Sequence, residues 1–322
     1  MRREQVDIII VNWNSGPRLR ACLESIARQR LSDVDIGSVV VVDNGSTDSS
    51  LSECGEVLGT RLQIVRNEKN LGFGRACNVG ARHAHGAFLL FLNPDSVLNE
   101  DSIVGAVAAL RDPKYSSVAV CGIKLVDESG RPGRTCTRFP TPWSMTVHSL
   151  GLNRLFPRRV PSYVMSEWSH EDTAFVDHVI GAFYLVRNDA FESVGGFDER
   201  FFVYMEDLDL SRRLASAGWR VLYSAAVSAY HEGGGSSKQI RGPRLFYSLR
   251  SRLQYCQAHF GRLGFLWVGA LTLIVEPFVR VGMSVVRLDF AGIGPVLAGY
   301  KMLYGSLLRG NQRTGAMQKR GL

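Results

Sequence analysis

The first half of the chain alternates short apolar runs with stretches whose apolar positions recur at helical spacing. Helices are expected from about Pro17, after Asp48 and from about Gly72. Because the apolar runs between them show no alternation, both faces of the sheet should be covered by helices, as in a parallel, doubly wound α/β sheet. The predicted strands are Val6 to Asn12, Val39 to Asp43, Leu62 to Arg66 and Phe88 to Leu92.

The second half has a weaker pattern. From about Asp112 to Trp168 the chain is rich in Pro, Gly, Arg and aromatic residues without a clean period, which indicates connecting strands and a mobile loop. After it we expect a strand, a short helix capped by Asn188, a turn at Gly195-Gly196 and a helix from about Asp207 to Gly218. The strands predicted in this half are Ala182 to Val186, Arg220 to Tyr223 and Ala226 to Tyr230.

Composition narrows the class of protein. With 322 residues, 45% of them apolar, the chain can bury a sizeable core. Its six cysteines are scattered and form no CxxC pair, which excludes a disulfide framework and a cysteine zinc site. The apolar run after the charged N-terminus is far too short for a signal sequence, so we expect a cytoplasmic protein.

The net charge of +8 is unevenly distributed. Residues 233–322 hold 13 basic and two acidic residues, a balance of +11, whereas residues 1–232 have a balance of −3. The basic residues of the tail are interleaved with long apolar runs, which favours an anionic membrane surface as partner and not nucleic acid. A solvated basic face is the alternative.

The apolar runs of the tail bear on its relation to the membrane. Leu263 to Val275 is uncharged but has only 13 residues, and Phe278 to Val286 is interrupted by Arg280. A spanning helix needs about 20 apolar residues, so neither piece crosses a bilayer alone, and a helix pair lying in the membrane plane is expected. The alternative packs these helices on the preceding part of the chain or against a second subunit, as in a homo-oligomer.

Polar residues follow three of the predicted strands. In a doubly wound sheet, ligands bind beyond the carboxyl ends of the strands. Asn12 and Asn14 follow the first strand, Asp43 ends the second, and Asn93 and Asp95 follow the fourth. A carboxylate at Asp43 could accept hydrogen bonds from a nucleobase or ribose, and one at Asp95 could hold a divalent cation against a diphosphate. Ordinary turns are the alternative for both positions.

Two further segments carry candidate chemistry. Glu206 and Asp207 begin a predicted helix within an aromatic-rich segment, where a partly desolvated carboxylate suits general-base work; a mere helix-dipole partner is the alternative. His231 ends a strand and precedes three glycines, with Lys238 and Arg241 close behind. The glycines could wrap a phosphate or form a lid hinge, although a lone histidine is more often structural.

In this order, VNWN, VVDNGSTD, RNEKNLGFGRACN, FLNPD, DHVIGAFYLVR, GGFDERFFVYMEDLDL and HEGGGSS resemble the family 2 glycosyltransferases, above all bacterial rhamnosyltransferases. The resemblance covers about residues 5–240. It implies a GT-A fold, a Rossmann-like, mostly parallel sheet flanked by helices, in residues 1–240. The nucleotide-binding half would be about 1–111 and the acceptor half about 112–240, with 241–322 as a basic, apolar helical tail that associates with the membrane.

The resemblance also implies site residues and a reaction. Asp207 would be the catalytic base, with Glu206 beside it, and Asp95 and His231 would bind Mg²⁺ or Mn²⁺. Two departures stand out: Asn93-Pro94-Asp95 replaces the common Asp-x-Asp, and His178 stands where many relatives have an aromatic residue. The implied nucleotide-binding residues are Asn12, Asn14, Asp43, Asn70, Arg75, Asn93, Lys238 and Arg241.

The expected function is inverting sugar transfer from a nucleotide diphosphate, rhamnose from dTDP-rhamnose, to a polyprenyl-linked or polysaccharide acceptor at the inner face of the cell membrane. A UDP- or GDP-sugar is the alternative donor. A nucleotidyltransferase would need a glycine- and lysine-rich phosphate loop, where this chain has Asn14-Ser15-Gly16-Pro17. An inactive sugar-binding module would have eroded site residues, and Asp95, Asp207 and His231 are all present.

Overall fold

The computed structural model divides the chain into two compact units. It describes residues 4–52, 54, 57–155, 163–233 and 241–309. The sheet unit comprises Met1–Phe139, Val164–Glu199 and Glu206–Ser236, and the helical unit comprises Pro140–Tyr163, Arg200–Met205 and Ser237–Leu322. Two segments that precede residue 240, 140–163 and 200–205, therefore cluster with the C-terminal helices.

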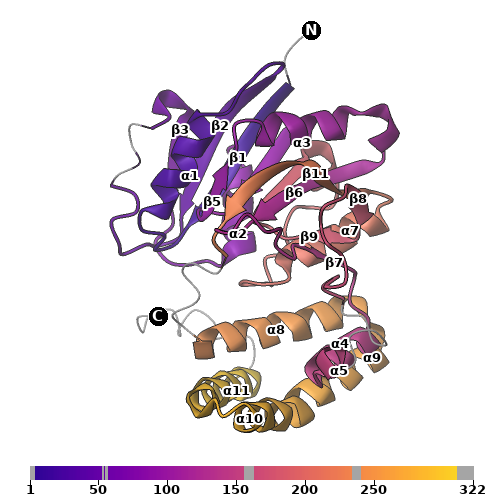
Figure 1. Ribbon diagram of the computed structural model, residues 1–322. Helices are drawn as coiled ribbons and strands as arrows, with labels where there is room; N and C mark the ends of the chain where they lie inside the picture. Colours follow the sequence, from indigo (N-terminus) through magenta and orange to yellow (C-terminus); the bar gives the residue numbers. More distant parts are fainter. Residues whose placement is uncertain (1–3, 53, 55–56, 156–162, 234–240, 310–322) are drawn as a thin grey trace. The chain divides into compact units, whose positions relative to one another are not determined.

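The sheet unit is built on a nine-stranded mixed sheet (Figure 1). The path of the sheet is β3-β2-β1-β4-β10-β6-β11-β5, with β8 paired to β11. The first four strands on this path are parallel, as expected, and β10 then runs antiparallel to both β4 and β6. The strands are β1 Glu4–Asn12, β2 Val34–Asp43, β3 Leu62–Arg66, β4 Phe88–Leu92, β5 Ser96–Leu98, β6 Val118–Val126, β8 Ala174–Val176, β10 Phe183–Arg187 and β11 Arg220–His231.

Helices cover both faces of this sheet, as the unbroken apolar strands predicted. On one face, α1 (Arg18–Ala27) and α3 (Ser102–Arg111) pack their apolar sides on alternate strand residues. On the other, α2 (Phe73–Ala81), α6 (Asn188–Ser193) and α7 (Glu206–Ser216) pack on the residues between them. Every residue of β4 is buried, so this strand forms the centre of the core.

Three details of the predicted secondary structure are wrong. No α-helix follows Asp48 in the described residues, which form turns and a 3-10 helix, η1 (Gly59–Arg61), because Asp48 bonds to Gly16 and Ser50 instead of capping a helix. The last two predicted strands are one strand, β11, with a register shift between Ser224 and Ser228. Asn188 is the first residue of α6 and does not cap it.

The segment without a clean pattern contributes regular structure to both units. It supplies β6 to the centre of the main sheet, and β7 (Cys136–Thr137), which pairs with β9 (His178–Val179). It also supplies a 3-10 turn, η2 (Pro113–Tyr115), and two helices of the helical unit, α4 (Pro142–Ser149) and α5 (Leu152–Leu155).

The remaining elements of the helical unit come from the tail: α8 (Arg241–His259), α9 (Gly261–Ala270), the π-helical turn η3 (Leu271–Val275), α10 (Glu276–Val286), a 3-10 turn η4 (Phe290–Gly292) and α11 (Ile293–Leu308). The core of the unit joins α8 to α11 through Phe246, Leu249, Leu253, Tyr300 and Leu303.

The expected pair of short tail helices is one continuous helix. Residues Gly261–Val286 form 26 helical residues that include an 18-residue window of mean hydropathy 1.6, and of the described residues only this helix is long and apolar enough to cross a membrane. Pro277 lies in the first turn of α10, directly after the π-helical turn. The wider turn changes the hydrogen-bond ladder where proline lacks its N–H, so the helix continues.

Candidate functional site

The predicted site residues of the sheet unit converge on one edge of the sheet. β2, β1 and β4 are adjacent and parallel, so Asp43, Asn12 and Asn93 leave the sheet at the same edge. β10 enters the sheet there, because it is antiparallel to β4 and the Asn93 N–H donates to the carbonyl of Ala182. Gly181, one residue earlier, donates its N–H to Asp207. The antiparallel strand thus brings the base candidate to the edge that carries the nucleotide candidates.

The first part of the site is a buried polar cluster around Asp43 and Asn12. The Asn12 amide donates to Oδ1 of Asp43 at 2.9 Å and to the hydroxyl of Ser50 at 2.9 Å. The Ser46 hydroxyl accepts from the backbone of Asn14 at 3.0 Å, and Asn14 has a positive φ of 50°. Asp43 is therefore fixed in orientation before any ligand binds, which suits a carboxylate that accepts from ribose or base hydroxyl and N–H groups.

The second part is the loop before α2. The Asn44 side chain bonds to Asn70 at 2.9 Å, to the carbonyl of Gly72 and to the N–H of Leu71. Gly45, with φ 77°, lies so close to this loop that an added Cβ would be 3.0 Å from the Cα of Lys69. Asn70 is thus engaged in holding the loop, and Arg75 pairs with Glu199 across 3.3 Å at a half-exposed position. Their predicted contacts with the nucleotide stay predictions.

The third part joins Asp95 and His231. β5 pairs with the end of β11 in a register that sets Ser96 opposite His231, and Nε2 of His231 lies 3.4 Å from Oδ1 of Asp95. Nε2 is buried and has no hydrogen-bond partner within the described residues. A buried imidazole nitrogen beside a carboxylate oxygen is a donor set that fits a divalent cation.

The two residues do not form a complete cage. Across the described ranges no group of three or more His, Cys, Asp and Glu side chains could hold a metal. A cation held by Asp95 and His231 would take further oxygen ligands from a bound diphosphate or water. Next to them, Arg18 and Glu232 form a bidentate ion pair, and Glu232 contributes most to raising the pKa of Arg18.

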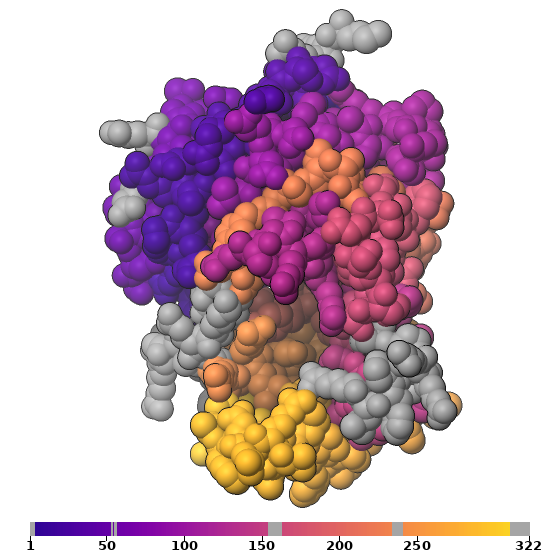
Figure 2. All heavy atoms as spheres, viewed as in Figure 1, coloured from indigo at the N-terminus to yellow at the C-terminus, as the bar shows by residue number. Residues whose placement is uncertain are grey.

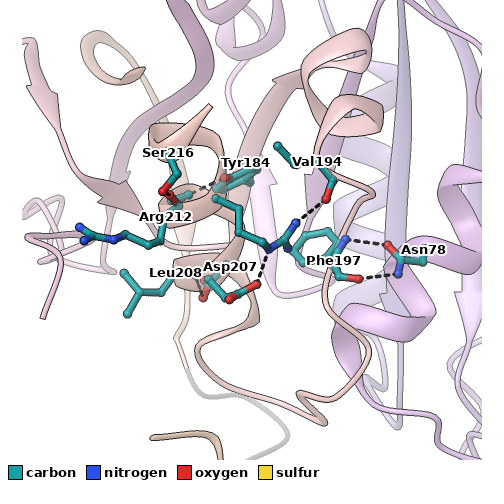
Figure 3. A network of polar contacts seen from close by, with 11 residues as sticks. Asn78, Tyr184, Val194, Phe197, Asp207, Leu208, Arg212 and Ser216 are labelled. Atoms are coloured by element: carbon teal, nitrogen blue, oxygen red, sulfur yellow. Dashed lines mark hydrogen bonds and ion pairs between the residues drawn. The ribbon is translucent and has the colours of Figure 1, made fainter. Parts of the chain in front are cut away.

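The fourth part is the carboxyl pair at the start of α7. Asp207 accepts from the Leu208 N–H at 2.8 Å through Oδ1 (Figure 3). Its Oδ2 accepts from the Gly181 N–H at 2.8 Å, and 18% of its side chain is exposed. Glu206 is buried against α2, where Gly74 makes room for it, and burial, with the charge of Asp207, raises its pKa well above the usual range. The raised pKa favours the neutral form of Glu206. Asp207 is the more exposed of the two, and its carboxylate is oriented by two backbone donors, which suits the role of base.

Two predicted nucleotide-binding residues are not among the described residues of the sheet unit. Lys238 falls outside the described residues. Arg241 is the exposed first residue of α8, in the helical unit.

Sequence reasoning missed several supporting residues. The sequence analysis assigns no site role to Ser46, Ser50 and Asn44, although their side chains organise the strand ends. The Arg18–Glu232 pair joins residues far apart in the sequence, and local patterns give no signal for it. The sequence does give a signal for His178, because a histidine stands there where many relatives have an aromatic residue.

Known proteins match the chain over most of its length. The pattern of the family described as "Glycosyl transferase family 2" matches residues 7–166, and that of "Glycosyl transferase family group 2" matches residues 88–262. Rhamnosyltransferase WbbL of Escherichia coli K12 is 30% identical over 263 residues, which cover 78% of this chain and 92% of that protein. This chain belongs to glycosyltransferase family 2. The N-acetylglucosaminyl-diphospho-decaprenol L-rhamnosyltransferase of Mycobacterium tuberculosis is 29% identical over 238 residues, 70% of this glycosyltransferase and 75% of that protein.

Solved structures show the same GT-A fold. The mannosyltransferase PcManGT of Pyrobaculum calidifontis, in complex with GDP-Man and Mn²⁺, superposes with a TM-score of 0.55 at 18% identity and covers 98% of this glycosyltransferase and 78% of that chain. Residues 1–349 of S. aureus TarS, in complex with UDP-GlcNAc, give a TM-score of 0.55 at 18% identity, over 92% and 79% of the two chains. The expected fold class is confirmed, and so is the class of enzyme, an inverting glycosyltransferase.

Proposed function

We propose that this glycosyltransferase transfers rhamnose from dTDP-rhamnose to a hydroxyl group of a polyprenyl-diphosphate-linked saccharide or a polysaccharide precursor. The similarity to two proteins named rhamnosyltransferases, over 70% and 78% of the chain, is the observation that carries the donor sugar. One of these names specifies a lipid-linked acceptor, which supports the acceptor class.

The geometry of the site supports a single displacement. Asp207, held by the Gly181 and Leu208 N–H groups, takes the proton of the acceptor hydroxyl. The oxygen of that hydroxyl bonds to the anomeric carbon from the face opposite the diphosphate, the bond to the diphosphate oxygen breaks, and the configuration inverts. The electron pair of the broken bond leaves with the nucleotide. Burial raises the pKa of the neighbouring Glu206 and so favours its neutral form, which leaves Asp207 as the carboxylate of the pair suited to accept the proton.

Other residues bind and orient the donor. Asp43, fixed by Asn12, accepts from the nucleoside, and Asn44 ties the neighbouring loop of Asn70 to the end of the same strand. Asp95 and His231 would hold a divalent cation, Mg²⁺ or Mn²⁺, which supplies positive charge to the leaving diphosphate. Two solved GT-A transferases, PcManGT and GalNAc-T7, are described with Mn²⁺, which supports a divalent cation in this class of site.

The helical unit supports a place for the enzyme at the inner face of the cell membrane. Leu263, Trp267, Ile274 and Phe278 recur at helical spacing on the continuous helix, and each exposes 60% or more of its surface. Figure 2 shows the neighbouring C-terminal helices, coloured yellow, as an outer surface of this unit. An apolar stripe of this length on one side of a helix is typical of interfacial binding.

The opposite side of the same helix argues for lying in the membrane plane. Val268, Leu271 and Glu276 are buried, and Glu276 pairs with Arg252 of α8. α8 carries four arginines, at 241, 244, 250 and 252, so it would not enter the hydrocarbon core beside a spanning helix. The helix therefore offers only its apolar stripe to lipid, with Arg262 and Arg287 exposed at its ends for lipid phosphates.

One experiment tests the transfer reaction directly. The purified enzyme is incubated with a panel of dTDP-, UDP- and GDP-sugars, with membrane lipid extract as acceptor, and products are separated by mass spectrometry. Transfer of a deoxyhexose from dTDP-rhamnose, at least about tenfold faster than from any other donor, is expected. Preference for a UDP- or GDP-hexose would replace the donor, and absence of transfer from every donor would overturn the proposed function.

A further inference from the structure

His178 lies beneath the carboxylate of Asp207. It belongs to β9, which faces α7, and only 4% of its side chain is exposed. Its Nε2 atom is 3.7 Å from Oδ2 of Asp207, the oxygen that also accepts from Gly181. This separation exceeds a hydrogen bond, yet a shift of about 1 Å would close it, and catalytic contacts commonly tighten when substrate binds.

The other ring nitrogen of His178 continues into a buried chain of hydroxyl groups. Nδ1 lies 3.0 Å from Oγ of Ser211, one turn after Asp207 on α7, and that Oγ lies 3.0 Å from the hydroxyl of Tyr184 on β10. Ser211 and Tyr184 are both fully buried. Figure 3 shows Tyr184 beside α7, with its dashed contact to that helix.

The direction of donation along this chain follows from Tyr184. Burial raises the pKa of its phenol, so Tyr184 keeps its proton and can donate it to Ser211 Oγ. The Ser211 hydroxyl can then donate its own proton to Nδ1 of His178. In this arrangement, which we infer, Nδ1 is the acceptor. Burial lowers the pKa of His178, so the ring is neutral at pH 7 and carries its one proton on Nε2, facing Asp207.

We propose that His178 is a positioning residue for the base Asp207, whose Nε2–H stabilises the ionised carboxylate and orients Oδ2. The inference rests on the proposed function, in which Asp207 is the base. Tyr184 and Ser211 act through His178 by fixing its tautomer, as outer partners fix the orientation of reactive groups elsewhere. None of the three needs to touch the sugar or the acceptor.

The other titratable groups around Asp207 do not supply this stabilisation. Glu206, on the same helix, has a pKa raised by burial, which favours its neutral form, and the buried thiol of Cys77 on α2 has a pKa raised by burial, then by Glu206 and Asp207. Asp177, next to His178, is a second acid. Of the described side chains that face Asp207, His178 offers the polarised N–H, so its removal should raise the pKa of the base.

The test is the pH dependence of kcat/KM for the full-length enzyme and three variants. In His178→Phe, the acidic limb should move to higher pH by about 0.5 to 1 unit, because the ionised base loses a donor. At pH 7, kcat should fall about tenfold while KM for the nucleotide sugar changes less than about twofold. His178→Gln, whose amide can donate, should recover part of the shift, and Tyr184→Phe should produce a smaller shift in the same direction.

Tyr223→Phe is the matched control. Tyr223 is as buried as Tyr184 but donates at 2.8 Å to the carbonyl of His170, outside the chain to Asp207. Its loss should leave the acidic limb in place. An unmoved acidic limb in an active His178→Phe enzyme would overturn the inference.

A second measurement is independent of transfer. Nitrogen-15 NMR of histidine-labelled enzyme, assigned with His178→Gln, should show His178 protonated on Nε2 and unprotonated on Nδ1 at pH 7. The reverse tautomer would overturn the inference even if no donor were found. A parent enzyme that transfers no sugar, but has the expected tautomer, would count against the proposed function and support the positioning geometry.

Discussion

Nε2 of His231 and Oδ1 of Asp95 lie 3.4 Å apart at the end of β11 and the start of β5. The contact depends on the antiparallel pairing that sets Ser96 opposite His231. It unites the strand-end carboxylate with a histidine from the other half of the chain. Nε2 has no hydrogen-bond partner among the described residues, so in the tautomer that carries the proton on Nδ1 its lone pair can bind a cation.

Transfer should therefore stop in chelator and return when Mn²⁺ or Mg²⁺ is added. His231→Ala should weaken metal-dependent binding of the donor by about 10-fold or more, while nucleoside binding changes little, since loss of a ligand acts on the diphosphate. Calorimetry with and without metal measures both. His85→Ala, at an exposed histidine, is the control. Full activity in chelator would contradict the metal site. Stabilisation of the leaving diphosphate would then be assigned to cationic side chains such as Lys238 and Arg241.

Replacing the base should remove transfer but not the fold. In Asp207→Asn, the amide oxygen can still accept from the Gly181 N–H, so the start of α7 is kept. The variant should lose on the order of 10²-fold or more in kcat, the scale of a general base. Nucleotide binding should remain close to that of the parent. Asp189→Asn, at an exposed acid in the first turn of α6, should retain activity. Near-parental transfer by Asp207→Asn would make Glu206 the next base candidate.

The raised pKa of Glu206 predicts a pH-dependent stability. The folded pKa lies well above the unfolded value of 4.5, so the contribution of protonated Glu206 is complete below that value and is lost as pH rises towards the folded pKa. Glu206→Gln cannot ionise. In urea unfolding at pH 5, 7 and 9, the unfolding free energy of this variant relative to the parent should increase with pH. Glu192→Gln, at an exposed glutamate, should track the parent, and parallel curves for Glu206→Gln would contradict the assignment.

The buried ion pair of the helical unit should be costly to break and cheap to replace. Glu276 is fully buried between Arg252 and Arg280, and Arg252 also donates to Ser149 on α4. Glu276→Gln alone should lower the unfolding free energy by about 3–5 kcal/mol because Arg252 stays buried without a counter-charge. Arg252→Met combined with Glu276→Leu should recover most of that loss. Thermal and urea unfolding measure both, and a single variant as stable as the parent would contradict a structural role for the pair.

The sequence was most informative where neighbouring strands are parallel. Their ends meet at one edge, so Asn12, Asp43 and Asn93 could be placed together from strand patterns alone. The position of Asp207 at this edge depends on β10 running antiparallel to β4, and no local sequence pattern specifies that direction. In the sequence, the charged residues Glu276 and Arg280 interrupt the apolar tail. In the structure both lie within one continuous helix, and Arg252 of α8 pairs with the charge of Glu276. Residues that act through distant partners were thus the ones that local reasoning misjudged.

The apolar stripe of the helical unit predicts binding to membranes. Leu263, Ile274 and Phe278 are exposed and take no part in the core of the unit, so their combined replacement by serine should leave the fold intact. Each side chain buried in lipid contributes about 1.5–3 kcal/mol, so the triple variant should lose more than about 100-fold in partitioning. Flotation with vesicles containing anionic phospholipid, at low and high salt, measures this loss. High salt should weaken the electrostatic contribution of Arg262 and Arg287 to vesicle binding and should leave the contribution of the apolar side chains.

Phe175→Ser supplies the control, because Phe175 is a partly exposed aromatic residue of the sheet unit, packed on Tyr115 and Arg220. This variant should float as the parent does. Sedimentation of the parent and of the triple variant without lipid measures their oligomeric state. It thus tests the alternative, in which a second copy of the chain covers the stripe. A parent that stays soluble with vesicles at low salt, and whose dimer dissociates in the triple variant, would assign the stripe to a second copy of the chain and remove the membrane from the proposed function.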